Sequence, residues 1–336
     1  REHFASKGLG LHNDLQNEHS IVANNPFVLM MRDFGTKEQQ AEWISGMLNG
    51  TRRPTFGLTE PNHGSDATHM ETRGVRQVRD GIDGWLLNGE KMWTTGMHVA
   101  SHCALFARTS GQDGDATGIT CFLVPAKDPG VKIEEYLWTF NMPTDHPRVS
   151  FTNVWVPDSA IFGREGLGLA VAQHFVHENR IRQAAGSLGA AVYCIEESVK
   201  YARNRKPFGK PLSDNQAIQF PLVELATQAE MLRLLIRKTA SEMDRMSKPE
   251  VEKRLSDKVS MCNYWANRLC CEAADRAMQV HGGLGYSRHK PFEHIYRHHR
   301  RYRITEGSEE IQMRKVAGWL FGYMGPRKKL FAEAAE

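Results

Sequence analysis

The chain has 336 residues, of which 40% are hydrophobic and 24% are charged, and its formal net charge is +4. This length allows a large core divided among two or three domains. The small net charge argues against a nucleic-acid-binding protein, and no stretch approaches the roughly 20 apolar residues that a membrane-spanning helix needs.

The cysteines and histidines indicate reduced thiols and no metal site. No two cysteines form a Cys-x-x-Cys pair, and most of them lie in apolar runs. His294, His298 and His299 are accompanied by no carboxylate or cysteine at ligand spacing. Reduced thiols predict a soluble intracellular protein, in the cytoplasm, the mitochondrial matrix or the peroxisome.

Residues 1–53 predict an N-terminal helical domain. A helical segment from Glu38 to Leu48 ends at the Gly50-Thr51-Arg52-Arg53 break. The chain begins at Arg1 and shows no signal-peptide pattern, so we expect that part of the native N-terminus is missing and that this domain is incomplete.

Residues 54–157 predict a middle β-domain. Short β-rich runs, such as 119–124 and 149–156, alternate with Asp-Gly, Asn-Gly and Pro-Gly turns. Many short strands with this punctuation are typical of an antiparallel sandwich or barrel.

Residues 158–336 predict a C-terminal domain of long helices. Apolar residues recur at helical spacing at Leu188, Val192, Ile195 and Val199, and similar stripes cover 218–236 and 255–273. Proline or glycine interrupts the pattern near 207–211, 247–249 and 282–283. Long helices with short connections pack as an antiparallel bundle, so the fold class is α+β with several domains.

Two stretches in the β-region carry candidate chemistry. Residues 56–67 form a turn rich in Gly, Ser and Asp, which would suit a polar ring or a phosphate, although the local chemistry alone favours a plain hairpin loop. In residues 88–96, Trp93 precedes two threonines at a strand end. This tryptophan would either stack on a flat cofactor or pack in the core.

Three further stretches lie in the helical region. Residues 204–212 are a basic cluster before a Gly/Pro turn, which would clamp a pyrophosphate or simply end a helix. Residues 279–286 read alone as a helix stop. In residues 303–312, Glu306 stands beside Gly307 before an amphipathic helix. It would be either a helix-start carboxylate or a base held against a substrate.

Together, from about Gly35 to Ala317, the five stretches resemble the acyl-CoA dehydrogenase family in content, order and spacing. The resemblance implies N-terminal helices, a central antiparallel β-barrel or sandwich and a C-terminal four-helix bundle. It also implies FAD as cofactor and dehydrogenation of an acyl-CoA to a trans-2-enoyl-CoA. An electron-transfer flavoprotein is the implied acceptor, and a homodimer or homotetramer is the implied assembly.

The resemblance assigns roles to individual residues, with Glu306 as the catalytic base. A minority branch of the family places the base one residue before Arg180, but that residue here is Asn179, which accepts no proton usefully. The implied substrate-binding residues are Ser65, Arg180 and Gly307. The implied cofactor-binding residues are Thr59, Trp93, Thr94, Thr95, Arg205, Phe208, Gln216, Gln279, Gly282, Gly283 and Ser308, some of which would reach a neighbouring subunit's cofactor.

Departures from the family pattern leave other functions open. Thr305 stands where the family often has Tyr, which predicts a different acyl pocket, and His177 and His298 replace frequent acidic residues. The alternatives are an acyl-CoA oxidase, or a flavin-binding family member with little dehydrogenase activity. The basic run 297–303 is interpreted as a structural or interface segment and not as a nucleic-acid patch.

Overall fold

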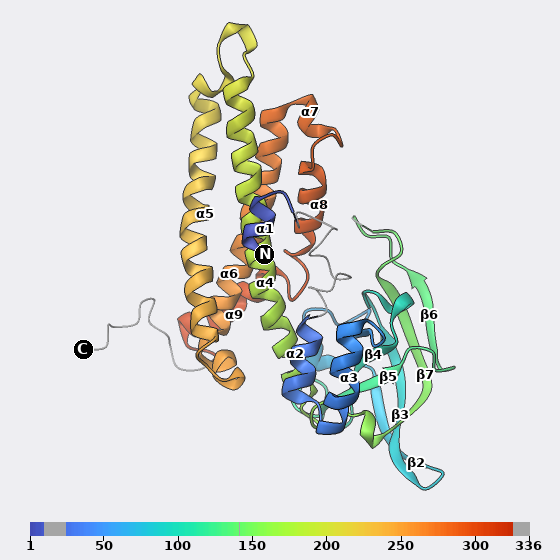
Figure 1. Ribbon diagram of the computed structural model, residues 1–336. Coiled ribbons are helices and arrows are strands. Elements are labelled where there is room, and N and C mark those ends of the chain that lie inside the picture. The colour runs from blue at the N-terminus through green and yellow to red at the C-terminus, as the bar shows by residue number, and fades with distance from the viewer. Residues whose placement is uncertain (10–24, 141, 325–336) are drawn as a thin grey trace, which may run out of the picture. The chain divides into compact units, whose positions relative to one another are not determined.

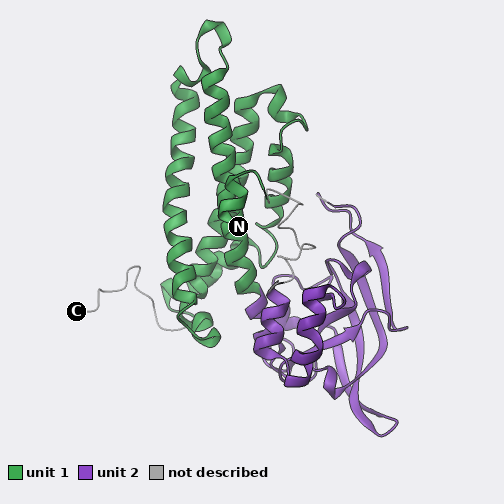
Figure 2. Ribbon diagram, in the orientation of Figure 1, with its two compact units in different colours: residues 1–17, 176–336 green, residues 18–175 purple. Residues whose placement is uncertain are grey.

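In the computed structural model, residues 1–9, 25–140 and 142–324 are described, and the chain divides into two units (Figure 2). Unit 1 comprises residues 1–17 and 176–336, and unit 2 comprises residues 18–175. The division falls within the long helix α4 (Gly168–Asn204). Residues 10–24 of the predicted N-terminal domain lie outside the described residues, and the three predicted domain boundaries stay a prediction.

Unit 2 is built on a seven-stranded sheet with two helices, α2 (Asn25–Phe34) and α3 (Lys37–Asn49). The strand path is β1-β4-β2-β3-β7-β6, and off this path β5 pairs antiparallel with β4. The strands are β1 (Pro54–Gly57), β2 (Arg73–Arg79), β3 (Ile82–Lys91), β4 (His102–Arg108), β5 (Ile119–Pro125), β6 (Val131–Tyr136) and β7 (Pro147–Pro157).

The sheet, predicted as antiparallel, also contains parallel pairings. β1 runs parallel to β4, with Pro54 opposite His102, and a single parallel bridge joins β2 to the end of β4. Parallel strands need a long crossover, and the whole β2–β3 hairpin lies between β1 and β4. Local turn signals report only on neighbouring strands, so they could not reveal this pairing.

The pair β4–β5 explains the continuous apolar runs of the sequence, because both of its faces are buried. Leu105 and Phe122 lie in one core with β3 and β7, whereas Phe106 and Cys121 lie in a second core with α2 and α3. A strand that is covered on both sides needs apolar residues at every position. The turn between β2 and β3 is made by Asp80 and Gly81, both at positive φ, as the predicted Asp-Gly hairpin requires.

Unit 1 is helical (Figure 1). One core takes side chains from α4, α5, α6 and α8, and the predicted stripe from Leu255 to Ala273 is buried throughout. Val199, predicted on the apolar face of α4, is instead 41% exposed. Beside α4, the helices of this unit are α1 (Glu2–Ser6), α5 (Gln216–Met243), α6 (Lys248–His281), α7 (Gly283–Tyr286), α8 (Phe292–Arg301) and α9 (Glu309–Phe321).

The expected mixture of N-terminal helices, a sheet and C-terminal helices is therefore confirmed. All six cysteines are free and buried, and burial raises the pKa of the Cys103 thiol to about 12. Within the described ranges, no helix combines the length and the apolar character that crossing a bilayer would require.

Candidate active site

In unit 1, the predicted base lies on the short segment between α8 and α9. Glu306 has φ +57° and Gly307 has φ +82°, so two consecutive residues adopt the left-handed conformation. A non-glycine residue rarely stays there unless its surroundings hold it, and such strain often marks a functional position. The side chain of Glu306 is half-buried.

Arg180 of α4 holds the backbone of this segment. Its Nε and Nη2 atoms donate to the carbonyl oxygen of Glu306 at 3.0 and 2.6 Å, and Nη1 reaches Ser260 Oγ at 3.3 Å. Burial lowers the pKa of the Arg180 guanidinium to about 10, so it stays charged at neutral pH. In this unit Arg180 supports Glu306, and its predicted contact with substrate stays a prediction.

Replacing Gly307 by alanine is expected to destabilise the protein by about 1–3 kcal/mol and to reduce turnover. A Cβ atom there would lie 2.9 Å from Arg180 Nη2, and the residue would also be held at positive φ. Gly186 is the matched control, since a Cβ there meets no atom within 4 Å on the helical α4, and alanine should stabilise that site. Urea unfolding of both variants tests this, and equal stabilities would contradict it.

A buried polar network on α6 supports the same segment and was missed from the sequence. Asn263 and Asn267, both fully buried, are joined at 3.2 Å, and Asn267 Nδ2 donates to the Tyr302 carbonyl at 3.0 Å. Gln312 Nε2 donates to Asn263 Oδ1 and to the Gly307 carbonyl. Two asparagines four residues apart inside a long helix are a detectable signal, because asparagine is unfavourable there.

The segment that carries Glu306 ends at the start of α9. Ser308, predicted to bind cofactor, is the N-cap, and its hydroxyl accepts from Ile311 N at 3.4 Å. Arg268 and Arg303 both donate to the Glu309 carboxylate and hold the pKa of that group at about 2. Arg303 of the basic run therefore has a structural partner within this unit.

In unit 2, the predicted flavin-edge residues lie on two adjacent segments. Met92 N donates to the Thr59 carbonyl at 2.8 Å, which joins the 59–61 turn to the end of β3. Trp93 follows at φ +60° with 47% of its surface exposed. Thr94, in contrast, is fully buried, and its hydroxyl has no hydrogen-bond partner among the described residues.

Thr95 is held from two sides. Its carbonyl accepts from the Thr55 hydroxyl, and its own hydroxyl lies 2.7 Å from Nδ1 of His146, a buried residue before β7. Sequence reasoning missed His146, because it is 51 residues away and in no recognised motif. The hydroxyl predicted to face the flavin is thus already oriented by the protein.

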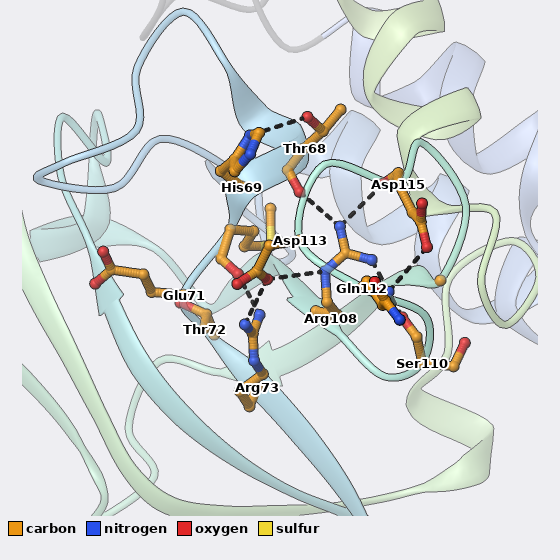
Figure 3. Close-up of polar contacts among 12 residues, drawn as sticks. Thr68, His69, Glu71, Thr72, Arg73, Arg108, Ser110, Gln112, Asp113 and Asp115 are labelled. Carbon is orange, nitrogen blue, oxygen red and sulfur yellow. Dashed lines mark hydrogen bonds and ion pairs between the residues drawn. The ribbon is translucent and has the colours of Figure 1, made fainter.

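Ser65 lies on an exposed turn. Arg108 anchors Thr68, three residues further along the chain (Figure 3). The Arg108 side chain is only 3% exposed, and its Nη2 donates to the carbonyls of Thr68 at 2.6 Å and Asp115 at 2.9 Å. Asp113 lies between Arg108 and Arg73 and forms ion pairs with both. One buried guanidinium thereby joins the segment after the Ser65 turn to the loop between β4 and β5.

The remaining predicted cofactor residues gather at one end of unit 1. The rings of Tyr201 and His281, near the ends of α4 and α6, are 4.3 Å apart, so the connections that follow both helices are neighbours (Figure 1). The predicted residues there are all exposed: Arg205, Phe208, Gln216, Gln279, Gly282 and Gly283. Arg180, which touches Glu306, lies 24 residues before the end of α4, and this spans roughly 36 Å.

Comparisons with known proteins identify the family. The model for the acyl-CoA dehydrogenase middle domain matches residues 55–154, and that for the acyl-CoA dehydrogenase C-terminal domain matches residues 166–321. The chain belongs to the acyl-CoA dehydrogenase family. Its members are FAD-dependent oxidoreductases, so this acyl-CoA dehydrogenase family protein is a flavoenzyme.

This family member aligns with several relatives over most of their length. It is 34% identical to 3-(aryl)acrylate reductase of Clostridium sporogenes, over 88% of this chain and 75% of that protein. It is 32% identical to the caffeyl-CoA reductase–Etf complex subunit CarC of Acetobacterium woodii, over 89% and 75%. It is 34% identical to the mitochondrial short-chain specific acyl-CoA dehydrogenase of Bos taurus, over 89% and 70%.

Solved structures of the family agree with this fold. Butyryl-CoA dehydrogenase from Megasphaera elsdenii superposes with a TM-score of 0.78 at 28% identity, covering 95% of this chain and 79% of that chain. A glutaryl-CoA dehydrogenase from Mycobacterium smegmatis in complex with FADH2 gives 0.76 at 27% identity, covering 88% and 72%.

The side chains of this acyl-CoA dehydrogenase family protein fit a flavin nucleotide. Trp93 offers an exposed aromatic face, and Phe208 is fully exposed at φ +54°. A Cβ atom added at Gly283 would meet no atom within 4 Å, so the described chain does not require glycine there, whereas Gly282 has the same open space but a φ of +60° that favours glycine. Open backbone beside an exposed basic turn suits a pyrophosphate.

Proposed function

We propose that this protein dehydrogenates an acyl-CoA thioester at Cα–Cβ to a trans-2-enoyl-CoA, with Glu306 as the base. The observation that carries the proposal is the segment holding Glu306. Arg180 fixes its backbone through two hydrogen bonds to one carbonyl, and the missing side chain at Gly307 leaves room for that guanidinium. A carboxylate held in a strained, half-buried position suits proton abstraction.

The chain's own residues perform the proton chemistry. The backbone N–H of Glu306 would donate to the thioester oxygen and so stabilise the negative charge that develops there. The Glu306 carboxylate would take the α-proton, and the electron pair of that C–H bond would form the new double bond. Bound FAD supplies the acceptor for the β-hydrogen, which leaves as hydride.

The residues that would hold the cofactor lie on two subunits in this proposal. Thr59, Trp93 and Thr95 would contact the isoalloxazine of their own chain's cofactor, with backbone contacts from Thr94 and a hydroxyl contact from Ser308. The set at the end of unit 1 would hold the pyrophosphate and adenine of a partner's cofactor, because roughly 36 Å of helix separates it from Arg180. This arrangement requires a homodimer or a homotetramer. Ser65, Arg180 and Gly307 would line the acyl-CoA site.

The finer architecture is part of the same proposal. We infer an N-terminal helical domain over 1–53, a β-barrel or sandwich over 54–157 and a four-helix bundle within 158–336. The matched family segments, 55–154 and 166–321, support the last two boundaries. The core shared by α4, α5, α6 and α8 supports the bundle.

The reverse reaction is a second candidate, favoured by two relatives. A 3-(aryl)acrylate reductase and a subunit of a caffeyl-CoA reductase–Etf complex are 34% and 32% identical to this chain. In that direction Glu306 would donate the proton to Cα. An electron-transfer flavoprotein is the proposed electron partner in both directions.

Anaerobic titration of the yellow holoprotein with a panel of acyl-CoAs tests the proposal. Bleaching of the flavin absorbance by saturated acyl-CoAs supports the dehydrogenase. Bleaching by none of them, together with reoxidation of the reduced protein by aryl-acrylyl-CoA, would favour the reductase. Peroxide release in air would indicate an oxidase, and no response to any thioester would leave only a flavin-binding protein.

A further inference from the structure

The carboxylate of Glu306 accepts a hydrogen bond from a residue of α4 that has no role in the proposed mechanism. Asn179 Nδ2 lies 3.2 Å from Glu306 Oε1. On its other side, Arg182 Nη1 lies 3.3 Å from Asn179 Oδ1. Asn179 and Arg182 are three residues apart, so they occupy the same face of the helix. The three side chains form a chain from guanidinium to amide to carboxylate.

The chemistry of the two neighbours fixes the orientation of the amide. A guanidinium only donates hydrogen bonds and an ionised carboxylate only accepts them. Arg182 therefore requires the amide oxygen, and Glu306 requires the amide nitrogen. The flipped amide would set oxygen against oxygen and nitrogen against nitrogen, and would lose both contacts.

We propose that Asn179 is a positioning residue for Glu306, that it donates its amide hydrogen to the carboxylate, and that Arg182 locks the amide in the donating orientation. This inference rests on the proposed function, in which Glu306 is the base. A donor to the charged form keeps the carboxylate ionised and limits its rotation, so the group is ready to accept a proton. Asn179 need not touch the substrate to do so.

Arg180 and Arg182 also interact with Glu306 through their own charges. Burial lowers the pKa of both Arg180 and Arg182 to about 10, so neither changes charge between pH 5 and 8. The pKa values of these two arginines are also influenced electrostatically by Glu178 on α4, Glu252 on α6, Tyr302 after α8 and Arg1. Glu178 is itself paired with Lys248 at 2.7 Å.

The test is the pH profile of kcat/KM for the FAD-loaded enzyme with an acyl-CoA that bleaches the flavin. Asn179→Leu keeps the size of the side chain and removes the donor. We expect the half-maximal pH of the acidic limb to rise by about one unit, with FAD content unchanged.

Arg182→Leu provides an independent route if Asn179→Leu folds poorly. It should move the limb in the same direction, because it frees the amide and also removes a positive charge that acts on Glu306. The double variant Asn179→Leu/Arg182→Leu should move the limb by less than the sum of the two single shifts, because part of the Arg182 effect passes through Asn179. A merely structural role would lower the rate at every pH and leave the limb in place.

An unchanged limb in both single variants, with Glu306→Gln inactive, would overturn the role of Asn179 and leave the proposed function standing. An active Glu306→Gln variant would instead overturn the proposed function itself.

Discussion

Replacing Glu306 by glutamine is expected to lower turnover by about 10³–10⁴-fold while the protein still folds and binds FAD. Glutamine has the same shape, and its amide oxygen can still accept from Asn179. Arg180 binds the backbone carbonyl of residue 306, so the segment keeps its support. The one property lost is the ability to accept a proton.

Rapid anaerobic mixing with excess acyl-CoA measures this directly, because the rate of flavin bleaching reports the chemical step. Glu272→Gln is the matched control, since Glu272 is an exposed carboxylate on α6 and its replacement should leave the rate within twofold. Bleaching at the normal rate in Glu306→Gln would place the base elsewhere.

The sequence predicted the helices and strands well, because they depend on local patterns. The stripe from Leu255 to Ala273 repeats at helical spacing, and the structure buries all of it. Val199 fits the same spacing but is exposed, since periodicity identifies a face without showing how far the neighbouring elements extend along it. The parallel pairing of β1 with β4 was missed for a related reason, because pairing across a whole hairpin leaves no local trace.

The candidate site was predictable only as a set of motifs. Glu306 and Trp93 stand out in the sequence, and both occupy strained positive-φ positions. The residues that contact Glu306 and Thr95 do not stand out. Asn179 and His146 are single polar residues in otherwise ordinary segments, and their roles depend on partners 127 and 51 residues away. Only the folded chain brings such pairs together.

A buried ion pair lies beside the segments that carry the predicted flavin-edge residues. Lys91 is fully buried, Glu60 is 3% exposed, and their Nζ and Oε1 atoms are 2.7 Å apart. Glu60 also accepts hydrogen bonds from the backbone N–H groups of Glu71 and Thr72. Glu60 follows Thr59, and Lys91 precedes the residue that donates to the Thr59 carbonyl, so the pair joins both segments.

Glu60→Gln is expected to destabilise the protein by about 3–5 kcal/mol, because it leaves the Lys91 charge buried without an opposite charge. Urea unfolding at pH 7 measures the loss. The double variant Glu60→Gln/Lys91→Met removes both charges and should recover most of it. If the double variant were as unstable as the single one, packing and not the ion pair would be responsible.

The pH dependence of stability provides an independent check on the same pair. Burial lowers the pKa of Lys91 to about 8, whereas an unfolded lysine has a pKa of about 10.4. Between these values the unfolded chain binds the proton and the folded chain does not, so the contribution of Lys91 to stability rises with pH across this window. Lys91→Met should remove that rise, and an identical slope in both proteins would contradict the assignment.

Because the pair anchors the Thr59 turn and the Trp93 strand end, Glu60→Gln should also release FAD more readily than Glu306→Gln. This difference separates support of the cofactor site from proton abstraction.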